Sequence, residues 1–216
     1  MAVLLPDTDV SRRELVRHEG RPAELFLHTL ADLPGFFDRD RLLRRGTLLF
    51  LYGEGVPLLD PHGDLAHART RAGEILAAGP PPLSPPERER ARYVLTCFMD
   101  DLIDTAPTTR SDRYEQLSLA DFTLRAASDL LTAHHGAWTG IGRWLPRRLL
   151  SADPALGDAL LAGHLKVAEH GDTAELTAAA RQVLDLVGGP LREGYVQRRA
   201  PGGQGAYEEA RGKAGA

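Results

Sequence analysis

The stretch SRRELVRHEGRPAELFLH, residues 11–28, decides the class of fold. Its two arms, Ser11–His18 and Arg21–His28, flank Glu19-Gly20, and glycine accepts the positive φ that a two-residue turn requires. The pattern therefore predicts a β-hairpin. Upstream, the short apolar run Ala2–Leu5 predicts one further strand. Three strands make a thin sheet, so we expect a truncated, mixed β-sheet at the start of the chain.

Side chains in the second arm of the hairpin alternate between two faces, as they do in any strand. This alternation places Glu24, Phe26 and His28 on the same face. Glu24 is thus an acidic residue within an otherwise apolar strand.

From about Phe36 onward, apolar residues recur at helical spacing, which predicts helices for the rest of the chain. The clearest start signal is Ser84-Pro85-Pro86-Glu87, which combines an N-cap, a proline in the first turn and a Glu at N3. Helix starts are expected at Asp64, Ser84, Ser118 with Asp121, Asp153 and Asp172. The helix that Asp64 opens should end at Ala78, before a glycine and three prolines.

The segment GPPPLSPP, residues 79–86, is the natural boundary between two domains. We expect residues 1–82 to form a small domain built on the truncated sheet, and residues 83–199 to form a helical bundle. Residues 200–216 are rich in glycine and have little to bury, which predicts a disordered tail. The expected fold class is α+β.

Composition and charge exclude several classes of protein. The chain has 216 residues, 43% hydrophobic and 26% charged, with a formal net charge of −4. This balance gives no reason to expect a nucleic-acid duplex or an anionic membrane as partner. Cys97 is a single cysteine, and no apolar run approaches the ~20 residues of a membrane span. With no signal peptide, we expect a cytoplasmic protein, and the composition is typical of a bacterium with a GC-rich genome.

Six segments, spread over the chain to about Tyr195, form a further pattern. They are AVLLP, RRELVRHEGRPAELFLHT, GVPLLDPHGDLAHARTRAGEILAAGPPPLS, RYVLTCFMDDLID, WTGIGRWLPRRL and LDLVGGPLREGY. Together they resemble the nucleotidyltransferase superfamily of the DNA polymerase β type, especially bacterial proteins related to the antibiotic-modifying nucleotidyltransferases. The resemblance implies Mg²⁺-dependent transfer of a nucleotidyl group from a nucleoside triphosphate to a hydroxyl of an acceptor that it does not name.

The resemblance also implies which residues carry the chemistry. In that family a Gly-Ser opens a helix, an Asp-x-Asp pair follows on the next strand, and a hairpin then carries a third carboxylate. Glu24 matches the third carboxylate and is the expected catalytic and metal-binding residue. No Gly-Ser or Asp-x-Asp precedes Ala2, so we expect an N-terminally truncated form. Asp7 and Asp9 do form an Asp-x-Asp, but they follow the strand, where such pairs are common in turns.

The missing acids matter because nucleotidyl transfer needs Mg²⁺ held by carboxylates and by the phosphates of the nucleotide. A third carboxylate can accept the proton of the attacking hydroxyl or orient it. Glu24 can perform that task, but it cannot hold the metal ions alone. The Gly-Ser helix start, whose free N–H groups would meet the triphosphate, is missing as well. We therefore expect residues 1–216 to have no appreciable transferase activity.

Two groups of arginines are candidates for contact with phosphate. The segment Asp38–Arg45 resembles an arginine-rich helix of the family and contains Arg41, Arg44 and Arg45. The later segment GVPLLDPHG resembles the short strand and turn that follow this helix in the family. The second group combines cations with two indoles and consists of Trp138, Arg143, Trp144, Arg147 and Arg148. The expected nucleotide-binding residues are Arg44, Arg45 and Arg143. The alternative is that the tryptophans anchor their segment to the helical core while the arginines are solvated.

Other motifs favour ordinary roles. Residues 100–104 spell DDxxD, the Mg²⁺-diphosphate pattern of prenyl-chain enzymes, but no second such motif accompanies them, and a solvated helix end explains them. His134-His135 and the pair His164 and His170 have no Cys or acids at ligand spacing, so helix-end or surface roles are expected.

Two functions from different classes stay open at this point. The first is a nucleotidyltransferase that is inactive in this form. The second is a non-catalytic binding or regulatory protein that keeps the nucleotidyltransferase core and the helical bundle as an interaction surface. A purely structural helical protein is a third and weaker reading.

Overall fold

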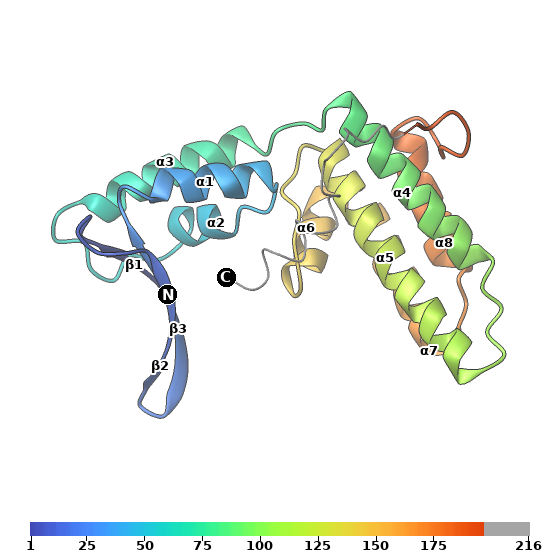
Figure 1. Cartoon of the computed structure of the whole chain (residues 1–216), viewed down its shortest axis with the longest axis horizontal. Coiled ribbons are helices and arrows are strands. Elements are labelled where there is room, and N and C mark those ends of the chain that lie inside the picture. The colour runs from blue at the N-terminus through green and yellow to red at the C-terminus, as the bar shows by residue number, and fades with distance from the viewer. Residues whose placement is uncertain (197–216) are drawn as a thin grey trace, which may run out of the picture.

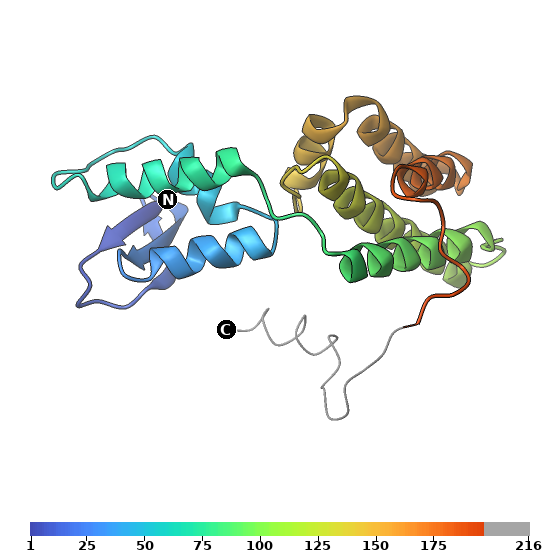
Figure 2. The same cartoon turned by 90° about the horizontal axis from the view of Figure 1, so that it is seen from above.

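The computed structural model describes residues 1–196. The expected tail, residues 200–216, and the last three residues of the expected helical domain lie outside this described part. Figure 1 shows a unit that contains the strands beside a unit made of helices, and Figure 2 shows the single segment that joins them. The α+β class expected from the sequence is confirmed.

The sheet consists of β1 (Ala2–Leu5), β2 (Arg12–His18) and β3 (Arg21–Thr29), in the order β1-β3-β2. β1 runs parallel to β3, and β2 and β3 form the antiparallel hairpin that the sequence predicts. At the turn, Glu19 and Gly20 both have positive φ, 49° and 76°. The far end of the hairpin projects away from the helices in Figure 1.

Three helices complete this unit: α1 (Leu33–Leu42), α2 (Thr47–Gly53) and α3 (Asp64–Ala78). Ala2 and Leu4 pack from β1 against the core that these helices form. The buried members of this N-terminal core are Leu33, Phe37, Leu49, Tyr52, Ala68, Ala72, Ile75 and Trp138. The expected helix from Asp64 to Ala78 is confirmed.

Two local expectations in this unit are wrong. The segment Asp38–Arg45 is not one helix, because α1 ends at Leu42 and both Arg44 and Gly46 have positive φ, which turns the chain into α2. The segment GVPLLDPHG, expected to form a short strand and a turn, contains a turn at residues 61–62 but no strand. Its two prolines lack the N–H that a ladder of hydrogen bonds requires.

The second unit contains α4 (Pro85–Ile103), α5 (Arg110–His134), α7 (Pro154–His170) and α8 (Ala174–Leu186), with the short α6 (Trp144–Ala152) between α5 and α7. The signal at Ser84 is confirmed, since its N–H donates to Glu87 Oε2 at 2.7 Å in a capping box. Asp153 caps α7 as expected, accepting the N–H of Leu156 at 2.9 Å. Within the described residues, no helix has the length and apolarity needed to cross a membrane.

The start predicted at Ser118 and Asp121 is wrong, because both residues lie inside α5. The helix begins at Arg110, where Thr109 and Asp112 form a reciprocal capping box: the Asp112 N–H donates to Thr109 Oγ1 at 3.2 Å and the Thr109 N–H to Asp112 Oδ2 at 2.9 Å. An Asp at N3 in place of Glu or Gln hides this signal.

The bundle has its own hydrophobic core, separate from the N-terminal one. Its fully buried leucines and valines are Leu95, Leu102, Leu130, Leu131, Leu149, Leu160, Val167, Leu176, Val183 and Leu184. Trp138 comes from the loop after α5 yet packs in the N-terminal core. The alternative that the tryptophans anchor their segment to the helical core is therefore only partly right. Trp138 does anchor the segment, but to the core of the N-terminal unit. The boundary at residues 82 and 83 stays a prediction.

Candidate functional site

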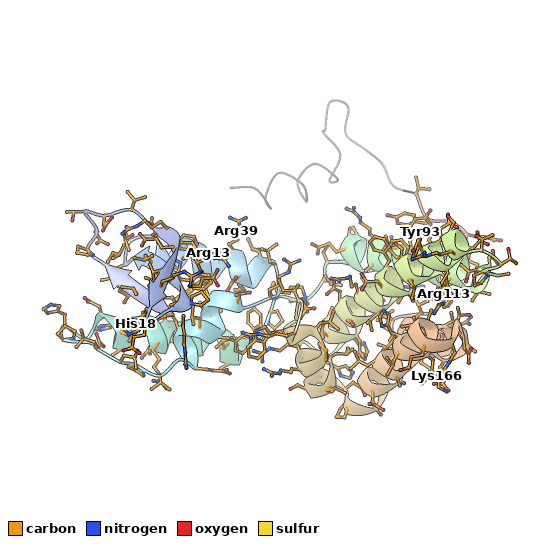
Figure 3. All side chains as sticks on the ribbon, turned by 90° about the horizontal axis from the view of Figure 1, so that it is seen from below. Arg13, His18, Arg39, Tyr93, Arg113 and Lys166 are labelled. Carbon is orange, nitrogen blue, oxygen red and sulfur yellow. The ribbon has the colours of Figure 1, made fainter. Side chains whose placement is uncertain are left out.

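Glu24 lies on β3, the central strand of the sheet, with its side chain 43% exposed. Arg13 of β2 donates from Nε to Glu24 Oε1 at 2.6 Å and stands 5.0 Å from the ring centre of Phe26. Figure 3 shows Arg13 on the hairpin. Among the described residues only Oε1 of this carboxylate accepts a hydrogen bond, so Oε2 is available to a ligand.

The start of β1 lies beside Glu24. The amino group of Met1 donates to the Glu24 carbonyl at 2.7 Å, and the Phe26 N–H donates to the Met1 carbonyl at 2.8 Å. Because β1 and β3 are parallel, the first residue of β1, Ala2, is level with Phe26, two residues beyond Glu24, and its last, Leu5, is level with Thr29. The two strands thus order the backbone on this side of Glu24.

Asp7 and Asp9 lie beyond the opposite end of β1. Glu24 and Thr29 are five residues apart, which at ~3.3 Å per residue separates Glu24 from that end by about 16 Å. Both acids also have structural partners: Asp7 Oδ1 accepts the N–H of Ala31, in the turn after β3, at 3.1 Å, and Asp9 Oδ1 accepts that of Val10 at 2.7 Å. Asp7 and Asp9 therefore cannot share one metal ion with Glu24.

The Mg²⁺ ion that the resemblance implies requires several oxygen ligands. Within residues 1–196, no three His, Cys, Asp or Glu side chains gather as a metal site. Glu24 offers a single carboxylate, one oxygen of which is bonded to Arg13. The described residues by themselves do not fit a Mg²⁺ site.

Arg44 joins the two units. It is 9% exposed, and its Nη1 donates to the carbonyl of Pro81 in the connecting segment. Its own carbonyl accepts the N–H of Thr139 at 2.8 Å, from the loop that carries Trp138. Burial lowers the pKa of its guanidinium, and the negative charges of Asp129 and Glu87 oppose this shift. Nη1 and the backbone carbonyl of Arg44 are thus bonded within the protein, whereas its buried Nη2 has no hydrogen-bond partner among the described residues.

The other two arginines expected to bind nucleotide are on the surface. Arg45 is exposed beyond the end of α1. Arg143 immediately precedes α6, with its guanidinium carbon 5.9 Å from the ring centre of Trp144. The hydrogen bonds and ion pairs of Glu24 among the described residues do not reach Arg44, Arg45 or Arg143.

A buried histidine of the hairpin was not identified as a site residue from the sequence. His28 is 5% exposed, its Nδ1 lies 2.9 Å from the hydroxyl of Tyr52 on α2, and its ring lies 4.8 Å from that of Phe36. Burial lowers the pKa of His28, with Asp32 opposing the shift, and burial raises the pKa of Tyr52. Alternation along the strand places His28 on the same face as Phe26, and this was the only sequence signal for the position of His28. It could not reveal the contact with Tyr52, because Tyr52 lies on α2.

His28 is expected to make folding sensitive to acid. A histidine whose pKa is lower in the folded state than its ordinary value of 6.5 takes up its proton first in the unfolded chain, so stability falls as pH drops below that value. His28→Asn keeps an oxygen near the position of Nδ1 but cannot titrate in this range. The free energy of unfolding, measured by urea at pH 7 and at pH 5, should therefore fall less in this variant than in wild type.

His18 is the control for this measurement, because it is exposed at the end of β2 (Figure 3). His18→Asn should keep the pH dependence of the wild type. An unchanged slope in His28→Asn would show that another group causes the acid sensitivity.

The remaining motifs have structural partners. In the DDxxD segment, Asp100 receives a two-pronged ion pair from Arg192, at 2.8 and 2.6 Å. His135 lies 3.3 Å from the carboxylate of Asp153, the residue that caps α7. Neither motif builds a metal site within the described residues.

A cavity of about 590 Å³ lies between β1, the end of α2, the loop that follows it and the start of α3. Its walls are mainly apolar and include Leu4, Leu51, Leu65 and Tyr52. Tyr52 thus contacts His28 and also lines this apolar cavity at the edge of the sheet.

Comparison of the sequence with protein-family models and with curated proteins gives no match. Among solved structures, the chain is similar to a nucleotidyltransferase-like protein from Exiguobacterium sibiricum, with 16% sequence identity and a TM-score of 0.42. The similar region covers 86% of this chain and 60% of that one. The chain thus spans about three fifths of the length of that protein.

Proposed function

We propose that this chain is a nucleotidyltransferase-like protein in which Glu24 is the carboxylate that faces the acceptor hydroxyl. The observation that carries the proposal is the position of Glu24: it lies on the central strand, beside the start of a parallel strand, with Oε2 available. This agrees with the place that the resemblance gives to the third carboxylate of the family.

Glu24 alone can act only on the hydroxyl of the acceptor substrate. A carboxylate oxygen within hydrogen-bond reach of a hydroxyl can orient it and accept its proton. Arg13 holds the carboxylate in one orientation through Oε1, which leaves Oε2 for the hydroxyl. Holding metal and triphosphate requires groups that residues 1–196 do not bring together. We therefore infer that residues 1–216 by themselves do not transfer nucleotides.

Of the arginines that the sequence assigns to the nucleotide, Arg45 and Arg143 are the ones we retain. Both are exposed, whereas the guanidinium of Arg44 is buried and bonded to the Pro81 carbonyl. The alternative function is a non-catalytic binding or regulatory protein that keeps the nucleotidyltransferase core and the helical bundle as an interaction surface. The lack of a group of three metal-ligating side chains within residues 1–196 supports this alternative.

An assay of pyrophosphate release tests the proposal. Purified residues 1–216 are incubated with Mg²⁺ and each nucleoside triphosphate, and no metal-dependent turnover is expected. Turnover that Glu24→Gln abolishes would overturn the inferred inactivity while keeping the role of Glu24. Turnover that survives in Glu24→Gln would contradict that role. Glu14→Gln is the matched control, because Glu14 lies on the neighbouring strand and is paired with Arg12 in the same manner.

A thermal-shift titration with Mg²⁺ and each nucleoside triphosphate separates the two functions from a purely structural role. Binding to the folded state alone raises the unfolding temperature with ligand concentration. A rise without turnover is the result we expect. No shift with any nucleotide would leave only the structural reading.

A further inference from the structure

Three arginines gather around one exposed indole on α6. The guanidinium carbons of Arg143, Arg147 and Arg148 lie 5.9, 4.9 and 5.5 Å from the ring centre of Trp144, which is 44% exposed. We call these four residues the α6 cluster. Attraction between a cation and an aromatic face helps to hold the guanidiniums in place, so the positive charge is organised before a ligand arrives.

The charge of the α6 cluster is not compensated locally. Within residues 1–196, no aspartate or glutamate forms a salt bridge with any of its arginines. By contrast, Arg125 and Arg181 each pair with an aspartate four residues away on their own helix. The first turn of α6 also contains no acidic residue, although negative charge is what the start of a helix favours.

Arg148 is the most confined member of the α6 cluster. Its guanidinium carbon lies 3.3 Å from the ring centre of Phe50 on α2, in the other unit. Burial lowers its pKa, and the negative charge of Glu54 opposes this without forming a salt bridge. A partly desolvated cation without a bonded anion is costly, and binding an anion offsets that cost.

We propose that the α6 cluster binds a polyphosphate group, either inorganic tripolyphosphate or the phosphate chain of a nucleotide. Three guanidiniums around a single ring concentrate positive charge at one place, which suits a ligand whose negative charges are equally close together. Sites for single-stranded nucleic acid offer several aromatic side chains on which successive bases stack, whereas the α6 cluster offers only Trp144. Sites that recognise an anionic membrane surface typically contain ~4–8 basic residues, whereas the α6 cluster contains three arginines. The site shares Arg143 with the nucleotide contacts retained above and in that respect rests on the proposed function, but it does not include Glu24 and does not depend on transfer.

Isothermal titration calorimetry of residues 1–216 with tripolyphosphate and with ATP, in the presence of EDTA, tests the site. The double variant Arg143→Ala/Arg147→Ala removes two exposed side chains, and circular dichroism verifies its fold. Its affinity should fall about tenfold or more, because charge-assisted hydrogen bonds to phosphate are lost. Arg110→Ala is the matched control: Arg110 is exposed at the start of α5, 5.6 Å from the ring centre of Tyr114, and the affinity should not change.

The ligands and variants distinguish the possible outcomes. Equal affinities for both ligands would assign the site to the polyphosphate itself, and tighter binding of ATP that Trp144→Ala removes would assign it to a nucleotide. No binding of either ligand, or binding that the double variant retains, would overturn the proposal. So would binding to phosphatidylserine-containing vesicles that the double variant loses, if tripolyphosphate does not bind. Glu24→Gln should leave the affinity unchanged, which separates this site from the proposed role of Glu24.

Discussion

Replacing Gly163 with alanine is expected to destabilise the helical bundle by about 1–3 kcal/mol, because the added methyl has no room. Gly163 lies in α7 where this helix packs against the start of α8. A Cβ atom built there would lie 2.5 Å from the backbone nitrogen of Leu176 and 2.7 Å from its Cα. These atoms are backbone, so they cannot rotate away as the end of a side chain could, and the two helices must separate.

Gly73→Ala is the matched control, since it makes the same change in another helix. Gly73 lies within α3, and a Cβ atom there would meet no atom within 4 Å. Alanine restricts the unfolded chain more than glycine does, so this variant should be more stable by about 0.5–1 kcal/mol. Urea unfolding followed by circular dichroism measures both. Equal midpoints for Gly163→Ala and wild type would contradict the packing of α7 on α8.

Removing the indole of Trp138 is expected to cost about 3–5 kcal/mol, the usual cost of replacing a large buried aromatic side chain with alanine. Trp138 is 9% exposed, its ring packs edge-on against Phe50, and its Nε1 donates to the Leu76 carbonyl at 3.3 Å. All of these contacts are with the N-terminal unit. Trp138→Ala should therefore lower the stability of that unit and loosen its attachment to the bundle.

Trp144→Ala is the control for Trp138→Ala, because the chain contains two tryptophans and the second is 44% exposed on α6. Its loss should change stability by a smaller amount. Thermal unfolding followed by circular dichroism, with limited proteolysis of the connecting segment, would separate the two variants. Equal effects of the two changes would contradict the assignment of Trp138 to the N-terminal core.

The loop after α5 connects the proposed anion site with the attachment of the two units. Trp138 and Thr139 contact the N-terminal unit, and the α6 cluster begins only a few residues later. Arg148 extends this connection by packing on Phe50 of α2. An anion bound to the α6 cluster would therefore sit next to the contacts that hold the two units together.

Local sequence signals predicted the elements whose stabilising groups are neighbours in the chain. Glu19-Gly20 predicted the hairpin because the turn depends on backbone φ, and Ser84 with Glu87 predicted α4 because a capping box closes within three residues. The start of α5 was misplaced although its signal is equally local, since Thr109 with Asp112 is a less usual pair. The turn at Arg44 was missed because a positive φ at an arginine has no sequence signature.

The sequence by itself determined the α+β class, the hairpin that carries Glu24 and most of the helix starts, since these depend on periodicity and on caps. Only the tertiary structure decided which candidate residues are accessible. Arg44 is buried against Pro81, His28 meets Tyr52, Trp138 belongs to the other unit, and Arg143 is exposed beside Trp144. The exposure and partners of each residue depend on residues that are distant in the sequence, and a local sequence pattern cannot predict those contacts.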